Sequence, residues 1–274
     1  MKLVSCQICN SNNYKLLFKT KDYDSNGKIF YNVVKCSKCN LIYLSPQPDK
    51  NFLSNFYVFN YYGNQSFFYK IFLFINNFII RNKATLILKK KKGRILDIGC
   101  GDGDFLKYMK DKGWDVYGIE TSKSGVELSK LKGNVYNAEL QNTKFPNKYF
   151  DVITLWHVLE HVSKPDDLMK EIKRIIKDNG ILIIAVPNID SIQAKIGGDK
   201  WFHLDVPRHL YHFSPETLKK LLKKNGFVIE KIKHFSFIYN LIGALQTFFN
   251  MLEIKFNFFH HLIKRVYRHE SYIN

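Results

Sequence analysis

Four of the five cysteines stand in two Cys-x-x-Cys pairs near the start of the chain. The pairs join Cys6 with Cys9 and Cys36 with Cys39, and 26 residues lie between them. Two thiolates on one tight turn can bind one ion, and a second such turn completes a tetrahedral site with no open position for catalysis. The spacing predicts a zinc ribbon over residues 1–50 with a structural Zn²⁺, and four free thiols are the alternative. Because about 50 residues bury little core, we expect the metal to supply much of the folding energy.

A second group of residues that could bind a ligand follows the short apolar run 94–98. It consists of Asp97 and a glycine turn with the spacing G-x-G-x-G, formed by Gly99, Gly101 and Gly103. Dinucleotide sites use G-x-G-x-x-G, and a carboxylate beside the turn would repel a pyrophosphate and attract a cation. About 20 residues further on, Glu120 ends the next predicted strand, where an acid can bind both hydroxyls of a ribose. A ribose without a pyrophosphate points to S-adenosylmethionine as the ligand.

From residue 93 onward, short apolar runs alternate with segments whose apolar residues recur at helical spacing. The strands and helices that this pattern predicts would position the residues described above. The predicted strands are 94–98, 115–119, 150–155, 181–186 and 227–233, and the predicted helices are 103–112, 122–131, 166–177 and 215–224. Such alternation predicts an α/β fold, a Rossmann-like doubly wound sheet with helices on both faces. We therefore expect a cofactor-binding domain over residues 93–234.

The two remaining segments are rich in apolar residues but do not suit a membrane span. Residues 51–92 predict an aromatic helical linker or lid, in which the apolar run 67–80 is too short to cross a bilayer. Residues 235–252 lack charge but contain five polar side chains, and Lys264, Arg265 and Arg268 follow. The tail 235–274 is expected to pack as a helix on the sheet or on a second copy in a homodimer. The alternative is a peripheral helix on an anionic membrane.

Composition excludes a disordered chain and leaves the nature of the partner open. Of 274 residues, 46% are hydrophobic, 15% aromatic and 24% charged. Lys and Arg number 42 against 24 Asp and Glu, giving +18, and residues 1–92 hold 15 basic against 3 acidic side chains. A solvated basic face and an anionic partner both explain this excess. No apolar segment precedes Cys6 to act as a secretion signal, so a cytoplasmic location is expected, with a peripheral position at the inner membrane face as a variant.

Asp97 to Gly103, Glu120 and Phe150-Asp-Val-Ile-Thr-Leu-Trp-His-Val-Leu-Glu-His161 resemble the class I S-adenosylmethionine-dependent methyltransferases. The two cysteine pairs and Trp201-Phe-His-Leu-Asp-Val-Pro-Arg-His-Leu-Tyr-His-Phe-Ser214 narrow the resemblance. The chain is similar, up to about residue 250, to the zinc-ribbon branch found in bacterial sugar and surface-polysaccharide gene clusters. Relatives usually close the sheet with a final antiparallel strand, and no strand pattern follows Leu252.

The resemblance implies roles for individual residues. The three glycines would cradle the methionine end beside Asp97, Glu120 would bind the ribose, and Thr121 would line the adenosine. Glu139 and Leu140 would contact the adenine. His209 is the first candidate for a catalytic base and His157 the second, against a purely structural reading of either histidine. Cys100 suits a small residue under the turn, and Trp201, Tyr211 and Tyr62 suit either stacking on a sugar or core packing.

The expected activity is methyl transfer from S-adenosylmethionine to a sugar nucleotide, glycan or glycolipid intermediate. Two alternatives remain, namely an RNA methyltransferase that uses the basic ribbon and a cofactor-binding scaffold without turnover. The basic residues do not form a stripe within a nucleic-acid-binding motif, which favours a small-molecule or glycan acceptor. A quinone-type lipid acceptor is a further variant of the enzyme reading.

Overall fold

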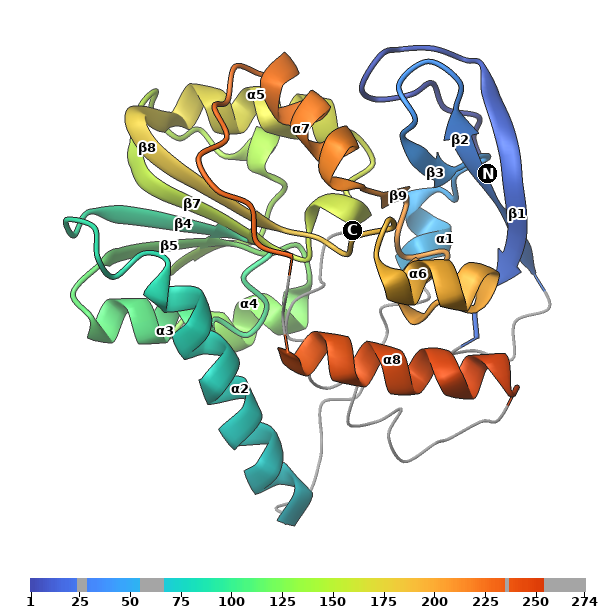
Figure 1. Ribbon diagram of the computed structural model, residues 1–274. Coiled ribbons are helices and arrows are strands. Elements are labelled where there is room, and N and C mark those ends of the chain that lie inside the picture. The colour runs from blue at the N-terminus through green and yellow to red at the C-terminus, as the bar shows by residue number, and fades with distance from the viewer. Residues whose placement is uncertain (24–28, 55–66, 235–236, 254–274) are drawn as a thin grey trace. The chain divides into compact units, whose positions relative to one another are not determined.

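A computed structural model describes residues 1–23, 29–54, 67–234 and 237–253 (Figure 1). The chain divides into two compact units. Unit 1 comprises residues 1–56, 159–169 and 186–261, and unit 2 comprises residues 57–158, 170–185 and 262–274. Residues 186–234, which the sequence groups with the cofactor-binding residues, thus belong to unit 1 together with the cysteine-rich segment.

Unit 2 contains a five-stranded parallel sheet with the order β6-β5-β4-β7-β8. The strands are β4 (Arg94–Ile98), β5 (Asp115–Ile119), β6 (Asn134–Tyr136), β7 (Phe150–Trp156) and β8 (Ile176–Ala185). The helices of this region are α2 (Phe67–Thr85), α3 (Asp104–Asp111), α4 (Lys123–Ser129) and the 3₁₀ turn Leu140–Asn142. Helix α5 (Pro165–Ile175) begins in unit 1 and ends in unit 2. The strand order reverses between β4 and β7, which is where open α/β sheets bind ligands. The predicted Rossmann-like fold is confirmed.

The core of unit 2 forms where helices cover the two central strands. Ile95, Leu96 and Ile98 of β4 are almost completely buried. Side chains of α2, among them Ala84, pack with Met109 of α3 into one cluster. The helical part of the predicted linker is therefore joined to the sheet by apolar contacts, which stabilise by about 25 cal/mol for each Å² buried.

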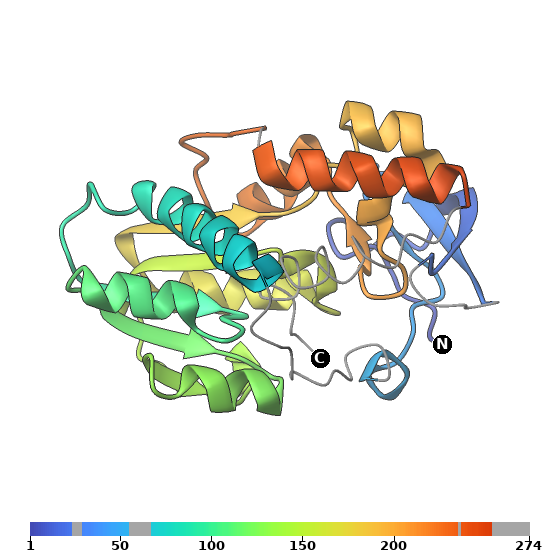
Figure 2. The same cartoon turned by 90° about the horizontal axis from the view of Figure 1, so that it is seen from below.

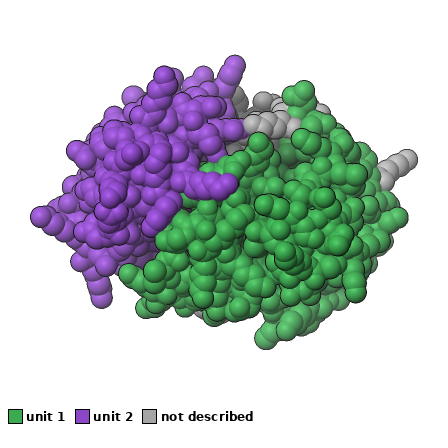
Figure 3. All heavy atoms as spheres, turned by 90° about the horizontal axis from the view of Figure 1, so that it is seen from above, with its two compact units in different colours: residues 1–56, 159–169, 186–261 green, residues 57–158, 170–185, 262–274 purple. Residues whose placement is uncertain are grey.

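Unit 1 contains an antiparallel sheet with the order β1-β2-β3-β9. Its strands are β1 (Tyr14–Lys21), β2 (Phe30–Cys36), β3 (Ile42–Leu44) and β9 (Tyr211–His212). Its helices are α1 (Lys50–Ser54), α6 (Ile192–Gly197), α7 (Pro215–Lys224) and α8 (Phe237–Met251), with 3₁₀ turns at Leu159–His161, Gly198–Lys200 and Phe202–Leu204. Strand β9 comes from a segment more than 160 residues after β3, and α6 and α8 run beside each other in both views (Figures 1 and 2). Figure 3 colours the two units separately.

Two predicted elements differ from those observed. The strand predicted over 227–233 is wrong, because these residues form no regular element and Val228 is 90% exposed. In the part of the chain that the structure describes, residues 227–233 pair with no strand of either sheet, and β9 takes the position beside β3. Strand β8 begins at Ile176, five residues before the expected start, because Ile176 already pairs with Phe150. Helix α5 consequently ends at Ile175.

Within the described ranges, no helix is both long and apolar enough to cross a membrane. Tyr62, most of the aromatic stretch 51–66 and the basic residues of the tail lie outside the described residues, as does the region after residue 253.

Candidate functional site

Glu120 joins the turns that follow the two neighbouring strands β4 and β5. Its Oε2 accepts a hydrogen bond of 3.0 Å from the amide of Gly101, and its Oε1 accepts one of 2.7 Å from the amide of Ser122. The side chain is fully buried, and this burial raises the pKa of Glu120 to about 8 although the amides oppose the shift. The predicted ribose-binding acid therefore also fixes the predicted glycine turn.

Asp97 is held at the end of β4 by a side chain from β7. It is 3% exposed, and its Oδ1 accepts a hydrogen bond of 2.5 Å from Oγ1 of Thr154. Thr154 is fully buried. The sequence did not identify this threonine as a functional residue, because a β-branched residue within an apolar strand is typical of the core. Its register partner in the parallel pairing is Asp97 itself.

The glycine turn is tight and packed from below. The amides of Gly99 and Cys100 donate hydrogen bonds of 2.8 and 3.1 Å to the carbonyl oxygen of Ile119. Gly103 has φ +78° and caps α3, and a Cβ there would lie 2.8 Å from Cβ of Ser129, so glycine is required. Cys100 is buried, and burial raises its pKa well above the ordinary value. A protonated, enclosed thiol is a packing residue, as expected, and not a nucleophile.

Gly125 of α4 is a second residue that sequence reasoning missed. A Cβ at this position would lie 2.9 Å from Cγ of Glu120 and 3.2 Å from the carbonyl oxygen of Gly101. Its amide donates a hydrogen bond of 3.3 Å to Oγ of Ser122, the N-cap of the helix. Only the absence of a side chain at Gly125 lets α4 approach the carboxylate this closely. The signal in the sequence was a glycine inside a predicted helix. Glycine lowers the stability of a helix, so its presence there indicates that close packing requires it.

A cavity of about 400 Å³ borders the turn after β6. It is lined by Tyr136, Asn137, Ala138, Asn142, Thr143, Lys144 and Phe145. Asn137 is oriented by Nδ2, which donates hydrogen bonds of 2.9 and 3.0 Å to the carbonyl oxygens of Glu120 and Thr121. Leu140 is buried at the following 3₁₀ turn, which Glu139 caps. The residues that flank Glu139 and Leu140 thus form the cavity wall, and those two side chains do not line it.

The two predicted bases belong to different compact units. His157, in unit 2, follows β7 with φ +57°, and its amide donates a hydrogen bond of 2.9 Å to the carbonyl oxygen of Ala185. A positive φ is uncommon for a residue other than glycine and marks a position held by its surroundings. This conformation is consistent with either role considered for His157.

His209, in unit 1, is 8% exposed and lies just before β9. Its Nδ1 is 2.9 Å from the carbonyl oxygen of His203, and its Nε2 is 3.7 Å from Oδ2 of Asp205. The Arg208 guanidinium pairs with the partly buried Asp205 and holds the pKa of that carboxyl well below its usual range, against the effect of burial. The neighbouring His161 contacts the His209 ring edge-on at 4.6 Å.

Trp201 and Tyr211, considered as sugar-stacking residues, are buried in unit 1. Trp201 is 3% exposed and Tyr211 is 1% exposed. The hydroxyl of Tyr211 donates a hydrogen bond of 3.0 Å to the carbonyl oxygen of Ser163. Side chains so enclosed present no ring face to a solvent-borne sugar, which favours the core-packing interpretation.

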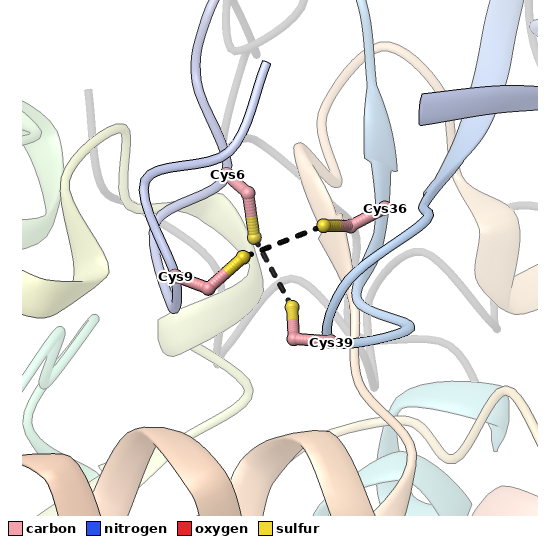
Figure 4. A group of neighbouring side chains, drawn as sticks. All are labelled: Cys6, Cys9, Cys36 and Cys39. Carbon is pink, nitrogen blue, oxygen red and sulfur yellow. Dashed lines mark hydrogen bonds between the residues drawn. The ribbon is translucent and has the colours of Figure 1, made fainter. Parts of the chain in front are cut away.

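The four paired cysteines converge on one point (Figure 4). The Sγ atoms of Cys6 and Cys39 are 3.3 Å apart, those of Cys9 and Cys36 are 3.5 Å apart, and all four lie within 4.8 Å of one another. Four sulfurs bonded tetrahedrally to Zn²⁺ at about 2.3 Å would be about 3.8 Å apart, so the geometry suits this ion. Burial alone would raise the pKa of Cys36, but the amides of Cys39 and Lys38 lower it to about 7.

The parallel sheet defines a Rossmann-like α/β protein. Its glycine turn, which Glu120 holds by a hydrogen bond, lies at the carboxyl ends of β4 and β5, where such proteins bind their ligands. A family profile described as "Methyltransferase domain" matches residues 70–232, which is more than half of the chain. The chain therefore belongs to this family, the class I S-adenosylmethionine-dependent methyltransferases, and is an enzyme that uses this cofactor.

Several curated proteins are similar over part of the chain. A ubiquinone biosynthesis O-methyltransferase of Pelagibacter ubique is 30% identical over 178 residues, 60% of this chain and 72% of that protein. A ubiquinone/menaquinone biosynthesis C-methyltransferase of Vibrio campbellii is 29% identical over 56% of this chain and 68% of its own length. Uncharacterized protein MJ0638 of Methanocaldococcus jannaschii is 35% identical over 46% and 57% of the two chains. For several of these relatives the chain spans between half and two thirds of their length.

Among solved structures, a SAM dependent methyltransferase from Archaeoglobus fulgidus matches with 25% identity and a TM-score of 0.48, over 64% of this chain and 87% of that one. An S-adenosylmethionine dependent methyltransferase from Mesorhizobium loti matches with 19% identity and a TM-score of 0.49, over 58% and 86%.

Proposed function

We propose that this methyltransferase acts on a sugar nucleotide, glycan or glycolipid intermediate. The observation that carries the proposal is the pairing of β9 with β3, in which Ile42 lies opposite His212 and Tyr43 opposite Tyr211. The segment 201–214 and the cysteine-rich segment are the parts by which the chain resembles the zinc-ribbon branch. Both segments contribute strands to one sheet, which supports the proposal that they act together and that this sheet faces the acceptor.

The ribbon is proposed to hold one structural Zn²⁺ on Cys6, Cys9, Cys36 and Cys39. Three of these side chains are buried and the fourth, Cys9, is partly exposed, and the sulfur separations suit a closed tetrahedral site. Beyond the cysteines, Lys220 of α7 donates a hydrogen bond of 3.0 Å to the carbonyl oxygen of Cys39. A filled site would therefore stabilise the knuckle to which α7 is attached, and with it the segment that carries β9.

In the cofactor half of the proposal, Glu120 would bind the ribose and Asp97 with the glycine turn would surround the methionine end. Two amides already anchor Glu120, so its carboxylate is preorganised to accept hydrogen bonds from vicinal hydroxyls. Thr121 and the cavity beside Asn137 would surround the adenosine. Methyl transfer from a sulfonium is an in-line displacement, so positioning supplies most of the catalysis.

A second acceptor class is favoured by the names of the relatives. The Pelagibacter ubique protein is named for O-methylation in ubiquinone biosynthesis, and the Vibrio campbellii protein for C-methylation in ubiquinone and menaquinone biosynthesis. A hydroxylated aromatic lipid is therefore the alternative acceptor. It differs from a sugar acceptor in partitioning into organic solvent, which makes the two classes separable.

The test is transfer of labelled methyl from S-adenosylmethionine into cell extract that has been separated into soluble sugar nucleotides, lipid-linked glycans, apolar lipids and RNA. The Glu120→Gln enzyme is the blank, and Glu127→Gln, at an exposed position of α4, is the matched control. Label in a sugar or glycan fraction that is absent with Glu120→Gln supports the proposal. Label in apolar lipids would favour a quinone-type acceptor instead, and label in RNA would favour an RNA methyltransferase. Cofactor binding without label in any fraction would favour a scaffold without turnover.

A further inference from the structure

Unit 1 contains a second cluster of metal-ligating side chains, separate from the four cysteines. Ligand atoms of Glu160, His161 and His209 all lie within 4.8 Å of one another. The three side chains are 1%, 4% and 8% exposed. A buried carboxylate among two imidazoles is costly unless its charge is compensated.

Two segments distant in sequence are fixed to each other at this cluster. Glu160 and His161 lie on the 3₁₀ turn Leu159–His161, and His209 lies just before β9. The backbone carbonyl of Glu160 accepts a hydrogen bond of 2.8 Å from the amide of Leu210, the residue next to His209. This bond sets the spacing of the three side chains, so their approach is built into the backbone.

Both imidazole rings are oriented by backbone carbonyl groups. Nδ1 of His161 is 3.0 Å from the carbonyl oxygen of Arg208, and Nδ1 of His209 is 2.9 Å from that of His203. A carbonyl oxygen only accepts, so each Nδ1 carries the hydrogen and donates it. In a neutral ring the lone pair then resides on Nε2. Histidine ligands of protein metal sites are held in this way, with the second nitrogen bonded to a carbonyl or carboxylate.

The local charge also attracts a cation. The carboxylate of Glu160 contributes one negative charge, and Asp205, whose Oδ2 lies 3.7 Å from Nε2 of His209, contributes a second. Arg208 pairs with Asp205 and balances its charge, so the net negative charge at the cluster is that of Glu160. Positive charge placed between the two rings is therefore favoured by Coulombic attraction, which is strong where water is excluded.

We propose that Glu160, His161 and His209 bind a divalent transition-metal ion of the class that prefers imidazole with carboxylate, such as Zn²⁺ or Fe²⁺. Two nitrogens and one carboxylate leave coordination positions open for water or a substrate oxygen, unlike the closed cysteine site. The inference goes beyond the proposed function and does not depend on it. It also gives His209 a different task from the one expected of a base, because a nitrogen lone pair that binds a cation cannot accept a proton.

Metal content of the full chain tests the proposal. Protein loaded with excess Zn²⁺ and desalted should retain about two ions per chain, one on the cysteines and one on the triad. The variants Glu160→Gln and His161→Asn should retain about one, and their cysteine-bound ion reports that unit 1 is still folded. The matched control is His212→Asn, since His212 is equally buried and its ring centroid lies 6.5 Å from that of His209. It should retain both ions.

Cobalt substitution assigns the ions without reference to turnover. Co²⁺ on thiolates absorbs strongly in the near ultraviolet, and Co²⁺ on nitrogen and oxygen does not. Glu160→Gln should keep the thiolate band and lose the second ion, and Cys39→Ser should remove the thiolate band. One ion in the unaltered protein, two ions that survive both triad substitutions, or joint loss of both ions in each triad variant would overturn the proposal. None of these outcomes bears on whether a methyl group is transferred.

Discussion

The carboxylate of Glu120 and the amide of Gly101, 19 residues apart in sequence, are joined by a hydrogen bond of 3.0 Å. The same carboxylate accepts a second bond from the amide of Ser122. One side chain therefore determines the shape of the glycine turn and presents the acid expected to bind the ribose. Loss of the carboxyl group should change both features together.

The substitution Glu120→Gln should weaken S-adenosylmethionine binding by at least about tenfold. The amide that replaces the carboxyl group turns a donor toward backbone amides that need an acceptor, and a buried donor left without an acceptor costs about 1–3 kcal/mol. Isothermal titration calorimetry measures the affinity. Glu127→Gln, on the exposed face of α4, should bind as the unaltered protein does, and an equal loss in both variants would contradict the assignment.

Cofactor affinity should rise with pH until about pH 8. Burial raises the pKa of Glu120 to about 8, so the free enzyme holds a proton there at neutral pH. Hydroxyl groups donate to the ionised form, and binding must therefore release this proton. The expected slope is at most about tenfold per pH unit below the pKa, and it flattens above. In Glu120→Gln the slope should vanish apart from titration of the ligand itself. Identical profiles for the two proteins would exclude linkage through Glu120.

Gly125→Ala should reduce cofactor affinity because the added methyl group displaces Glu120. The new Cβ would lie 2.9 Å from Cγ of Glu120, and crowding of this kind costs about 1–3 kcal/mol. Gly198→Ala is the control, since no atom lies within 4 Å of a Cβ added there, although the φ of +53° at Gly198 disfavours any side chain. It should lower stability modestly and leave affinity unchanged. Equal affinities in the two variants would show that α4 moves instead of the carboxylate.

Thr154→Val should destabilise the protein and lower cofactor affinity. The substitution keeps the shape of the side chain but removes the donor 2.5 Å from Oδ1 of Asp97, an acid that is 3% exposed. Loss of a buried hydrogen bond to a charged group costs about 1–3 kcal/mol. Denaturant unfolding gives the change in stability. The control is Thr85→Val, which removes an exposed hydroxyl that donates to the carbonyl oxygen of Asn82. This variant should change neither the stability nor the cofactor affinity by much.

Local patterns in the sequence predicted the parallel sheet, and long-range contacts account for what they missed. The run 94–98 and the glycines that follow it are encoded within ten residues, so turn chemistry and apolar periodicity identify them. Thr154 and Gly125 act through neighbours that only the folded sheet provides. The pairing of β3 with β9 could not be predicted either, because two-residue strands have no periodicity. The same limit explains the wrong strand at 227–233, whose pattern was locally adequate but had no partner.

Removal of one ribbon thiolate should unfold the ribbon, whereas removal of the isolated thiol should not. Cys39→Ser leaves three ligands around the proposed Zn²⁺, and structural zinc sites supply on the order of 10 kcal/mol to small domains that lack a core of their own. We expect loss of one zinc ion and a lower unfolding midpoint by calorimetry. Cys100→Ser is the control, because Cys100 is buried under the glycine turn in unit 2, away in sequence from both cysteine pairs, and holds a protonated thiol. It should keep the cysteine-bound zinc, and loss of zinc in Cys100→Ser, or retention in Cys39→Ser, would refute the four-cysteine site.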